Sequence, residues 1–124
     1  MAQGANNYDS IPGLKATGDL SSSQYKAVKM SSTAGSVKVC SATTDIGIGV
    51  LQNKPKDGQP AEVAFFGICK AQLAASVTVA KPLLYPNTTG QLQGTSVMAA
   101  AVIGQAFEAS SATPGEIHPI MIGR

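Results

Sequence analysis

The feature that most constrains this 124-residue chain is how often Gly, Pro, Asn and Thr interrupt its apolar segments. From residue 23 onward, short apolar runs alternate with turn-forming clusters such as residues 53–58 and 87–90. No amphipathic period between them is long enough for a crossover helix. We therefore predict an all-β fold, a small antiparallel β-sandwich or barrel over residues 23–124, preceded by an extended N-terminal arm.

The apolar pattern places seven strands in this domain. Residues 61–71 are apolar on both faces, which indicates a central or bent strand, and Gly67 within them indicates a bulge or a close backbone approach. Residues 97–101 favour helix by composition, so we expect a short bridging segment there. In the last strand the isoleucines are the core candidates: Ile117, Ile120 and Ile122. The expected strands are residues 24–31, 36–40, 46–51, 61–71, 76–85, 101–109 and 116–122.

A weak internal echo links two parts of the chain. Residues 48–51 lead through a polar turn to Gly67, and residues 103–106 lead through a polar turn to Gly123. Both segments have the pattern of strand, turn and strand. This pattern fits two related hairpins that pack across one core, although two copies of unequal length also arise by chance.

Residues 1–22 lack any helical or alternating period and are rich in Gly, Ser, Thr and Asn. We predict that they form an arm, separate from the β domain at residues 23–124. Isolated apolar residues interrupt this arm at Tyr8, Ile11 and Leu14. Two interpretations stay open: a frayed terminus, or a segment that orders against a partner through these three side chains.

Charge excludes the commonest polyanion binders. Charged residues make up 13% of the chain, the net charge is +2, and the lysines are scattered, whereas nucleic-acid binders cluster Lys and Arg. No apolar run approaches the ~18 residues of a membrane span, and residues 1–7 lack the features of a secretory signal. We expect synthesis in a cytosol, where Cys40 and Cys69 are reduced thiols, and partners that are neither nucleic acid nor membrane.

The sequence offers few groups for catalysis. Its one histidine, His118, lies in the last expected strand, and Cys40 and Cys69 lie in apolar strand contexts. No spacing of Cys and His fits a metal site, and the glycines form no phosphate-binding loop. We therefore predict no catalytic residues, no metal and no cofactor, and keep an enzyme that uses Cys40 or Cys69 with His118 as a minor alternative.

The order of several strand and turn motifs resembles that of the small capsid decoration, or cement, proteins of tailed bacteriophages. The resemblance covers residues 18–124. This sequence departs from the commonest members in its longer N-terminal segment and in its Phe65-Phe66 pair. The matching segments are GDLS (18–21), QY (24–25), IGVLQN (48–53), AEVA (61–64), GICKA (67–71), VTVAKPL (77–83), GQL (90–92) and IGQAFEA (103–109).

The resemblance implies an all-β virion protein that is made in the host cytoplasm and binds the outer surface of the expanded phage head. It implies the major capsid protein as partner and self-association as a homotrimer. We further predict that Tyr8, Ile11 and Leu14 of the arm contact the capsid. A tail or fibre component of the virion shares the same composition and β pattern and is the main alternative; a host-encoded ligand-binding barrel is another.

Overall fold

The computed structural model describes residues 7–74, 77–78, 81–98, 101–107 and 114–123. Within these residues the fold is all-β, with no helix, which confirms the predicted fold class. The strands are β1 (Asn7–Ser10), β2 (Lys15–Ala16), β3 (Ala27–Met30), β4 (Ser36–Val39), β5 (Gly49–Leu51), β6 (Val63–Leu73), β7 (Leu83–Pro86), β8 (Leu92–Thr95), β9 (Gly104–Ala106) and β10 (Glu116–Ile122).

Each of the seven expected strands overlaps an observed strand, and three observed strands were not predicted: β1, β2 and β8. These three are short, and β8 has only one fully buried apolar side chain, Leu92, so none of them produces an alternating pattern. The helical tendency expected at residues 97–101 is not realised in the described part of that segment, which is bend, turn and irregular chain. Residues 99–100 lie outside the described residues.

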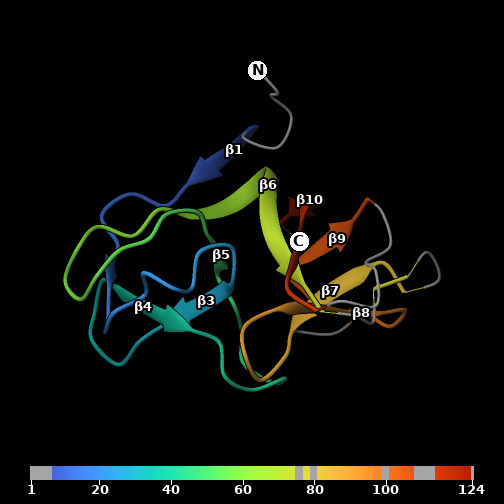
Figure 1. The fold of residues 1–124 in the computed structure, drawn as a ribbon, viewed down its shortest axis with the longest axis horizontal. Helices are drawn as coiled ribbons and strands as arrows, with labels where there is room; N and C mark the ends of the chain where they lie inside the picture. Colours follow the sequence, from blue (N-terminus) through green and yellow to red (C-terminus); the bar gives the residue numbers. More distant parts are fainter. Residues whose placement is uncertain (1–6, 75–76, 79–80, 99–100, 108–113, 124) are drawn as a thin grey trace.

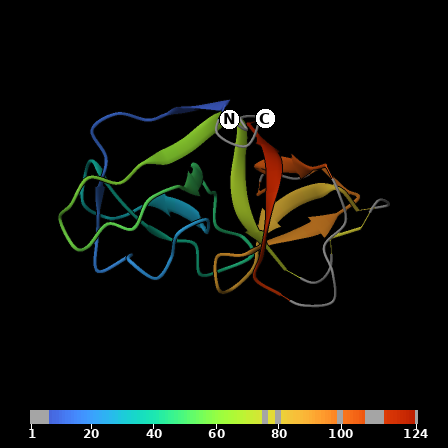
Figure 2. The ribbon, with the colours of Figure 1, turned by 45° about the horizontal axis from the view of Figure 1, so that its top comes forward.

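Strand β6 connects two lobes that lie side by side (Figures 1 and 2). On one side, the strand order β6-β8-β7-β9-β10 closes into a five-stranded barrel, because β10 also pairs with β6. On the other side, the order β6-β5-β3-β4-β2 forms the second lobe. With 11 residues, β6 is long enough to take part in both.

The N-terminal lobe is also a ring of strands. Residues 7–16 run antiparallel to residues 60–68: Tyr8 pairs with Gly67, and Lys15 forms a bridge with Pro60. Backbone hydrogen bonds fill the interval, from Ile11 N to Val63 O at 3.1 Å and from Ala61 N to Leu14 O at 2.9 Å. The bridge between Lys15 and Pro60 joins β2 to the chain just before β6. This pairing closes the strands β2-β4-β3-β5-β6 into a ring.

The two lobes repeat the same arrangement. The order β2-β4-β3-β5-β6 in the first matches β6-β8-β7-β9-β10 in the second. In each lobe the first pair of the order is parallel, and the pairs that follow are antiparallel. We call β1–β5 with residues 63–66 the first unit, and residues 67–73 with β7–β10 the second unit. The weak similarity between residues 48–67 and residues 103–123 therefore corresponds to a structural repeat. The repeat includes both predicted hairpins, β5–β6 and β9–β10.

A pair of glycines marks equivalent positions in the two units. A Cβ at Gly49 would lie 2.2 Å from the backbone oxygen of Ala64, and one at Gly104 would lie 2.6 Å from that of Met121. Gly49 also pairs with Val28 as Gly104 pairs with Leu84. In each unit, therefore, two backbone segments pack so closely at this glycine that no side chain fits between them.

Two apolar clusters fill the molecule. Neighbouring residues on β3, β5 and β6 point to opposite clusters: Val28, Leu51 and Val63 to the first, and Ala27, Val50 and Ala64 to the second. This explains why residues 61–71 are apolar on both faces, because this part of the sheet separates two cores. The first cluster is Leu14, Ala16, Leu20, Val28, Val37, Leu51, Ala61 and Val63; the second is Ala27, Cys40, Val50, Ala64, Cys69, Ala71, Leu73, Val77, Leu84, Leu92, Ile103, Ile120 and Ile122.

The interpretation of Gly67 is confirmed. It has φ +110°, a conformation that other residues rarely adopt, and a Cβ there would lie 2.5 Å from the backbone oxygen of Asn7. The ladder between β1 and β6 skips Phe65, which leaves a bulge next to this glycine. The bulge and the glycine lie where β6 passes from one unit to the other.

The prediction of a buried Ile117 was wrong. Ile120 and Ile122 are buried at 0% and 2% exposure, but Ile117 is 51% exposed. Side chains of a strand alternate between its faces, so an odd-numbered residue of β10 points away from the core that the even-numbered isoleucines fill.

The first unit includes residues 7–22 of the predicted arm. Leu14, Ala16 and Leu20 are buried in its core, at 8%, 3% and 6% exposure. The segment also supplies β1 and β2, which pair with β6 and β4. In the repeat, residues 7–16 take the place in the first unit that the second half of β6 takes in the second unit. They therefore form the strand segment with which the first unit begins.

We expect Gly49→Ala to destabilise the fold by about 1–3 kcal/mol, the usual cost of overpacking a tight site. Gly104→Ala should give a similar loss, because its added Cβ meets backbone in the same way. Gly47→Ala is the matched control, since its nearest atoms would lie at 3.4 Å, an ordinary contact. Urea unfolding of the three variants measures the effect, and a Gly49→Ala variant as stable as Gly47→Ala would contradict the close approach.

Candidate partner-binding surface

The structure buries both thiols and places a carboxylate beside the imidazole. Cys40 and Cys69 are free thiols at 1% and 0% exposure, and burial raises their pKa to about 11 and about 12. Cys69 lies opposite Ile120 in the β6–β10 ladder, whereas His118 lies opposite Ala71. The imidazole Nε2 of His118 is 3.0 Å from Oε1 of Glu116. Both thiols are therefore protonated at neutral pH and shielded from solvent.

Neither cysteine should react with a disulfide reagent while the protein is folded at pH 7–8. The attacking species is the thiolate, which burial disfavours here. Both thiols should titrate rapidly once the protein is unfolded in guanidinium chloride. A fast reaction of one thiol in the folded protein would revive the thiol–imidazole enzyme alternative.

The described residues hold few groups of charged side chains that could bind a ligand. Among the described residues, no group of three or more His, Cys, Asp or Glu side chains could hold a metal ion. The described chain also contains no helix that is long and apolar enough to cross a membrane. One open cavity of about 430 Å³ lies beside the five-stranded barrel, and none of the described residues that line it is charged. Its lining residues are Thr43, Thr44, Tyr85, Thr95, Val97, Ala101 and Val102.

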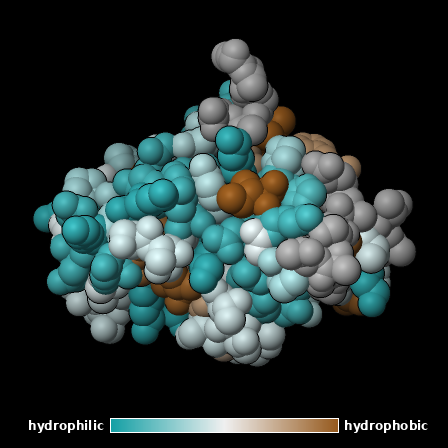
Figure 3. Space-filling model, viewed as in Figure 1, coloured by the Kyte–Doolittle hydropathy of each residue, from teal (hydrophilic) through white to brown (hydrophobic). Residues whose placement is uncertain are grey.

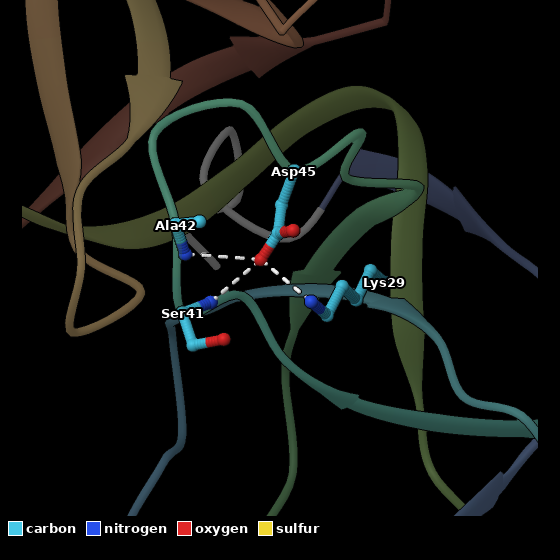
Figure 4. Close-up of polar contacts among 4 residues, drawn as sticks. All are labelled: Lys29, Ser41, Ala42 and Asp45. Atoms are coloured by element: carbon cyan, nitrogen blue, oxygen red, sulfur yellow. Dashed lines mark hydrogen bonds and ion pairs between the residues drawn. The ribbon is translucent and has the colours of Figure 1, made fainter.

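A polar cluster around Asp45 holds the loop that supplies two of these threonines (Figure 4). Oδ2 of Asp45 accepts hydrogen bonds from Nζ of Lys29 at 2.7 Å and from the backbone N–H groups of Ser41 at 2.8 Å and Ala42 at 3.0 Å. The hydrogen bond from Lys29, followed by that from Ser41, holds the pKa of Asp45 below its ordinary value. The cluster fixes a loop and has no feature of a reaction centre.

We expect Asp45→Asn to lower Tm at pH 7, because the folded state loses a carboxylate that accepts three hydrogen bonds. A folded-state pKa below the unfolded one means that the stabilisation is complete above the ordinary Asp pKa of about 4 and is lost as pH falls through the lowered value. The Tm difference between wild type and variant should therefore shrink in acid. Asp9→Asn, at an exposed position on β1, is the control. A difference that stays constant from pH 7 to pH 2 would contradict this role.

Exposed large apolar side chains are unevenly distributed along the chain. Among the described residues, two such side chains, Met30 and Ile46, lie before β6, and seven others lie on β6 or after it. The view in Figure 3 shows such groups as separate brown patches within a hydrophilic surface. Large contiguous apolar patches rimmed by polar residues are typical of protein-contact surfaces, whereas apolar side chains scattered singly are common on any protein. The seven are Phe65, Phe66, Val97, Met98, Phe107, Ile117 and Met121.

The three residues expected to contact a partner lie along one edge of the first unit. Ile11 and Leu14 line a groove of about 430 Å³, whose other wall includes Pro60 and Glu62. The hydroxyl of Tyr8 donates a hydrogen bond to Glu62, and burial together with this bond raises the pKa of Tyr8. Tyr8 and Ile11 are half-buried and Leu14 is buried. Ile11 and Leu14 thus share one groove, and Tyr8 contacts its wall through Glu62. The contact of the three residues with a capsid stays a prediction.

Comparison with known proteins gives a match at the level of fold alone. No protein-family model matches the sequence, and the search of curated proteins finds no match. A solved structure of similar fold is the N base of head fiber gp8.5 in bacteriophage phi29, with a TM-score of 0.62 and 16% sequence identity. The match covers 89% of this chain and 90% of that chain. The chain is therefore similar in fold, over nearly its whole length, to the base of a phage head fibre.

Proposed function

We propose that this protein is a structural component of a bacteriophage virion, without enzymatic activity, that binds the outer surface of the phage head. The observation that supports this most strongly is the similarity of almost the whole fold to a head-fibre base. The resemblance of the motif order to head decoration proteins points to the same surface. The first line rests on backbone geometry, and the second rests on the order of sequence motifs.

In this proposal the partner is the major capsid protein, and the protein stabilises the expanded head as a decoration, or cement, protein. The weakly charged surface favours close packing against a protein shell, since few charges need to be desolvated. Self-association as a homotrimer would let several modest contacts act together. The groove lined by Ile11 and Leu14, with Tyr8 beside it, is the proposed capsid contact.

A second candidate function is the base of a head fibre. The name of the phi29 protein favours it, because that structure is itself the base part of a fibre. A fibre base and a decoration protein would both attach to the head, and they differ in whether they carry a further projecting part. A tail component is the remaining virion alternative.

The decisive experiment mixes the purified protein with expanded phage heads that lack it and separates bound from free protein by sedimentation. We expect saturable binding to a fixed number of sites per head. Heads incubated with bovine serum albumin serve as the control for trapping. The proposal is wrong if the protein stays in the supernatant at every concentration, or if immunogold labels the tail of intact virions instead of the head.

Substitution at the groove then tests the contact surface. Ile11→Ser should weaken head binding several-fold, because it removes apolar area from the proposed contact. Ile46→Ser is the matched control, at an exposed isoleucine outside the groove. Circular dichroism and Tm of both variants show whether the fold is retained. Equal head affinity of two folded variants would remove the groove from the proposal.

A further inference from the structure

The internal repeat leaves one face of the second unit uncovered, although the equivalent face of the first unit is buried. In the first unit, Ala27, Val50 and Ala64 form a row in register across β3, β5 and β6. All three have 0% exposure. In the second unit, the equivalent row across β7, β9 and β10 is Leu83, Gln105 and Met121. Here Leu83 is half-buried, Gln105 is exposed and Met121 is 46% exposed.

The β7–β8 turn lies against Ala27, at one end of the first row. The backbone N–H of Ala27 donates to the carbonyl oxygen of Gly90 in that turn at 2.8 Å. The turn packs so closely that a Cβ at Gly90 would lie 2.4 Å from Cγ1 of Val39 and 3.3 Å from Cβ of Lys26. The second unit therefore buries the row against its own core side chains, and this turn covers the end of the row at Ala27.

The first unit has the equivalent turn, whose outer surface is exposed, while the carbonyl oxygen of Gly35 accepts a hydrogen bond from the backbone N–H of Lys15 at 3.0 Å. Gly35 lies two residues before Val37 of β4, as Gly90 lies two residues before Leu92 of β8, and both have positive φ, +75° and +86°. No atom lies within 4 Å of the position that a Cβ at Gly35 would occupy. Residues 32–35 are all exposed. One chain thus presents both halves of a contact that it already makes once internally.

We propose that a second copy of this chain packs the β3–β4 turn at residues 32–35 against the outer row of Leu83, Gln105 and Met121. The contact is head-to-tail, because each copy contributes a different surface, and such contacts close into rings when the rotation allows it. Five of the nine exposed large apolar side chains among the described residues lie in the second unit, and one of them, Met121, lies in the outer row. This inference rests on the proposed function, because it identifies the surfaces through which the proposed homotrimer would form.

The first test changes the outer row. Met121→Glu places a charge in the proposed contact, and Met30→Glu is a matched control, since Met30 is 44% exposed on β3 of the first unit. Sedimentation velocity over a concentration series should show oligomers for the wild type and Met30→Glu, and monomers for Met121→Glu. A wild type that is monomeric throughout, or a Met121→Glu variant that assembles like the wild type, overturns the proposal.

The second test distinguishes a head-to-tail contact from a symmetric one. Ala34→Glu, at an exposed position of the turn, should also give monomers, because it alters the other half of the contact. When the two variants are mixed, the intact turn of Met121→Glu can still bind the intact row of Ala34→Glu, so one-to-one heterodimers should form. A mixture that stays monomeric overturns the head-to-tail arrangement.

Failure of this inference and failure of the proposed function give different results. Self-association is measured without heads, and head binding of the same samples is measured separately. Wild-type protein that assembles but does not bind heads would contradict the virion role and leave the contact intact. Wild-type protein that binds heads but sediments as a monomer in their absence would support the virion role and overturn this inference.

Discussion

The whole structure depends on the backbone hydrogen bonding of β6, which is a member of both strand rings. On one edge it pairs with β5 and then with β10; on the other it pairs with β1 and then with β8. A strand that is paired on both edges cannot shift its register without breaking both rings. Gly67 and the bulge at Phe65 let the strand change direction between the units, so the relative position of the two barrels follows from one short segment.

The repeat of the two units explains the uneven surface of the molecule. Equivalent positions have different environments, because the second unit covers the first and nothing in the described chain covers the second in the same way. Small residues such as Ala27 and Ala64 occupy the covered row, and a long flexible side chain, Met121, occupies the equivalent open row. Methionine adapts to varied partner surfaces, which suits an interface better than a fixed core. The asymmetry between the two units is therefore the basis of the proposed self-association.

The sequence allowed most of the second unit and the sheet around β3 and β5 to be predicted, because β-branched and apolar residues alternate there between clear turn signals. It did not predict β1, β2 or β8. The pairing of residues 7–16 with β6 depends on contacts about 50 residues away in the chain, and local composition there is that of a loop. Of the candidate contact residues, Tyr8, Ile11 and Leu14 were found from their isolated apolar character, but the burial of Leu14 in the core was not.

The sequence alone determined that the chain is all-β, that its turns lie where Gly, Pro and Asn cluster, and that its cysteines lie in apolar segments. These properties follow from local backbone preferences and from the period of apolar side chains. Only the tertiary structure decided that the chain forms two barrels sharing one strand, and which of two equivalent faces is buried. The physical reason is that both units satisfy the same local rules, so the difference between them arises from long-range packing: the β7–β8 turn lies against Ala27, and the β3–β4 turn remains open.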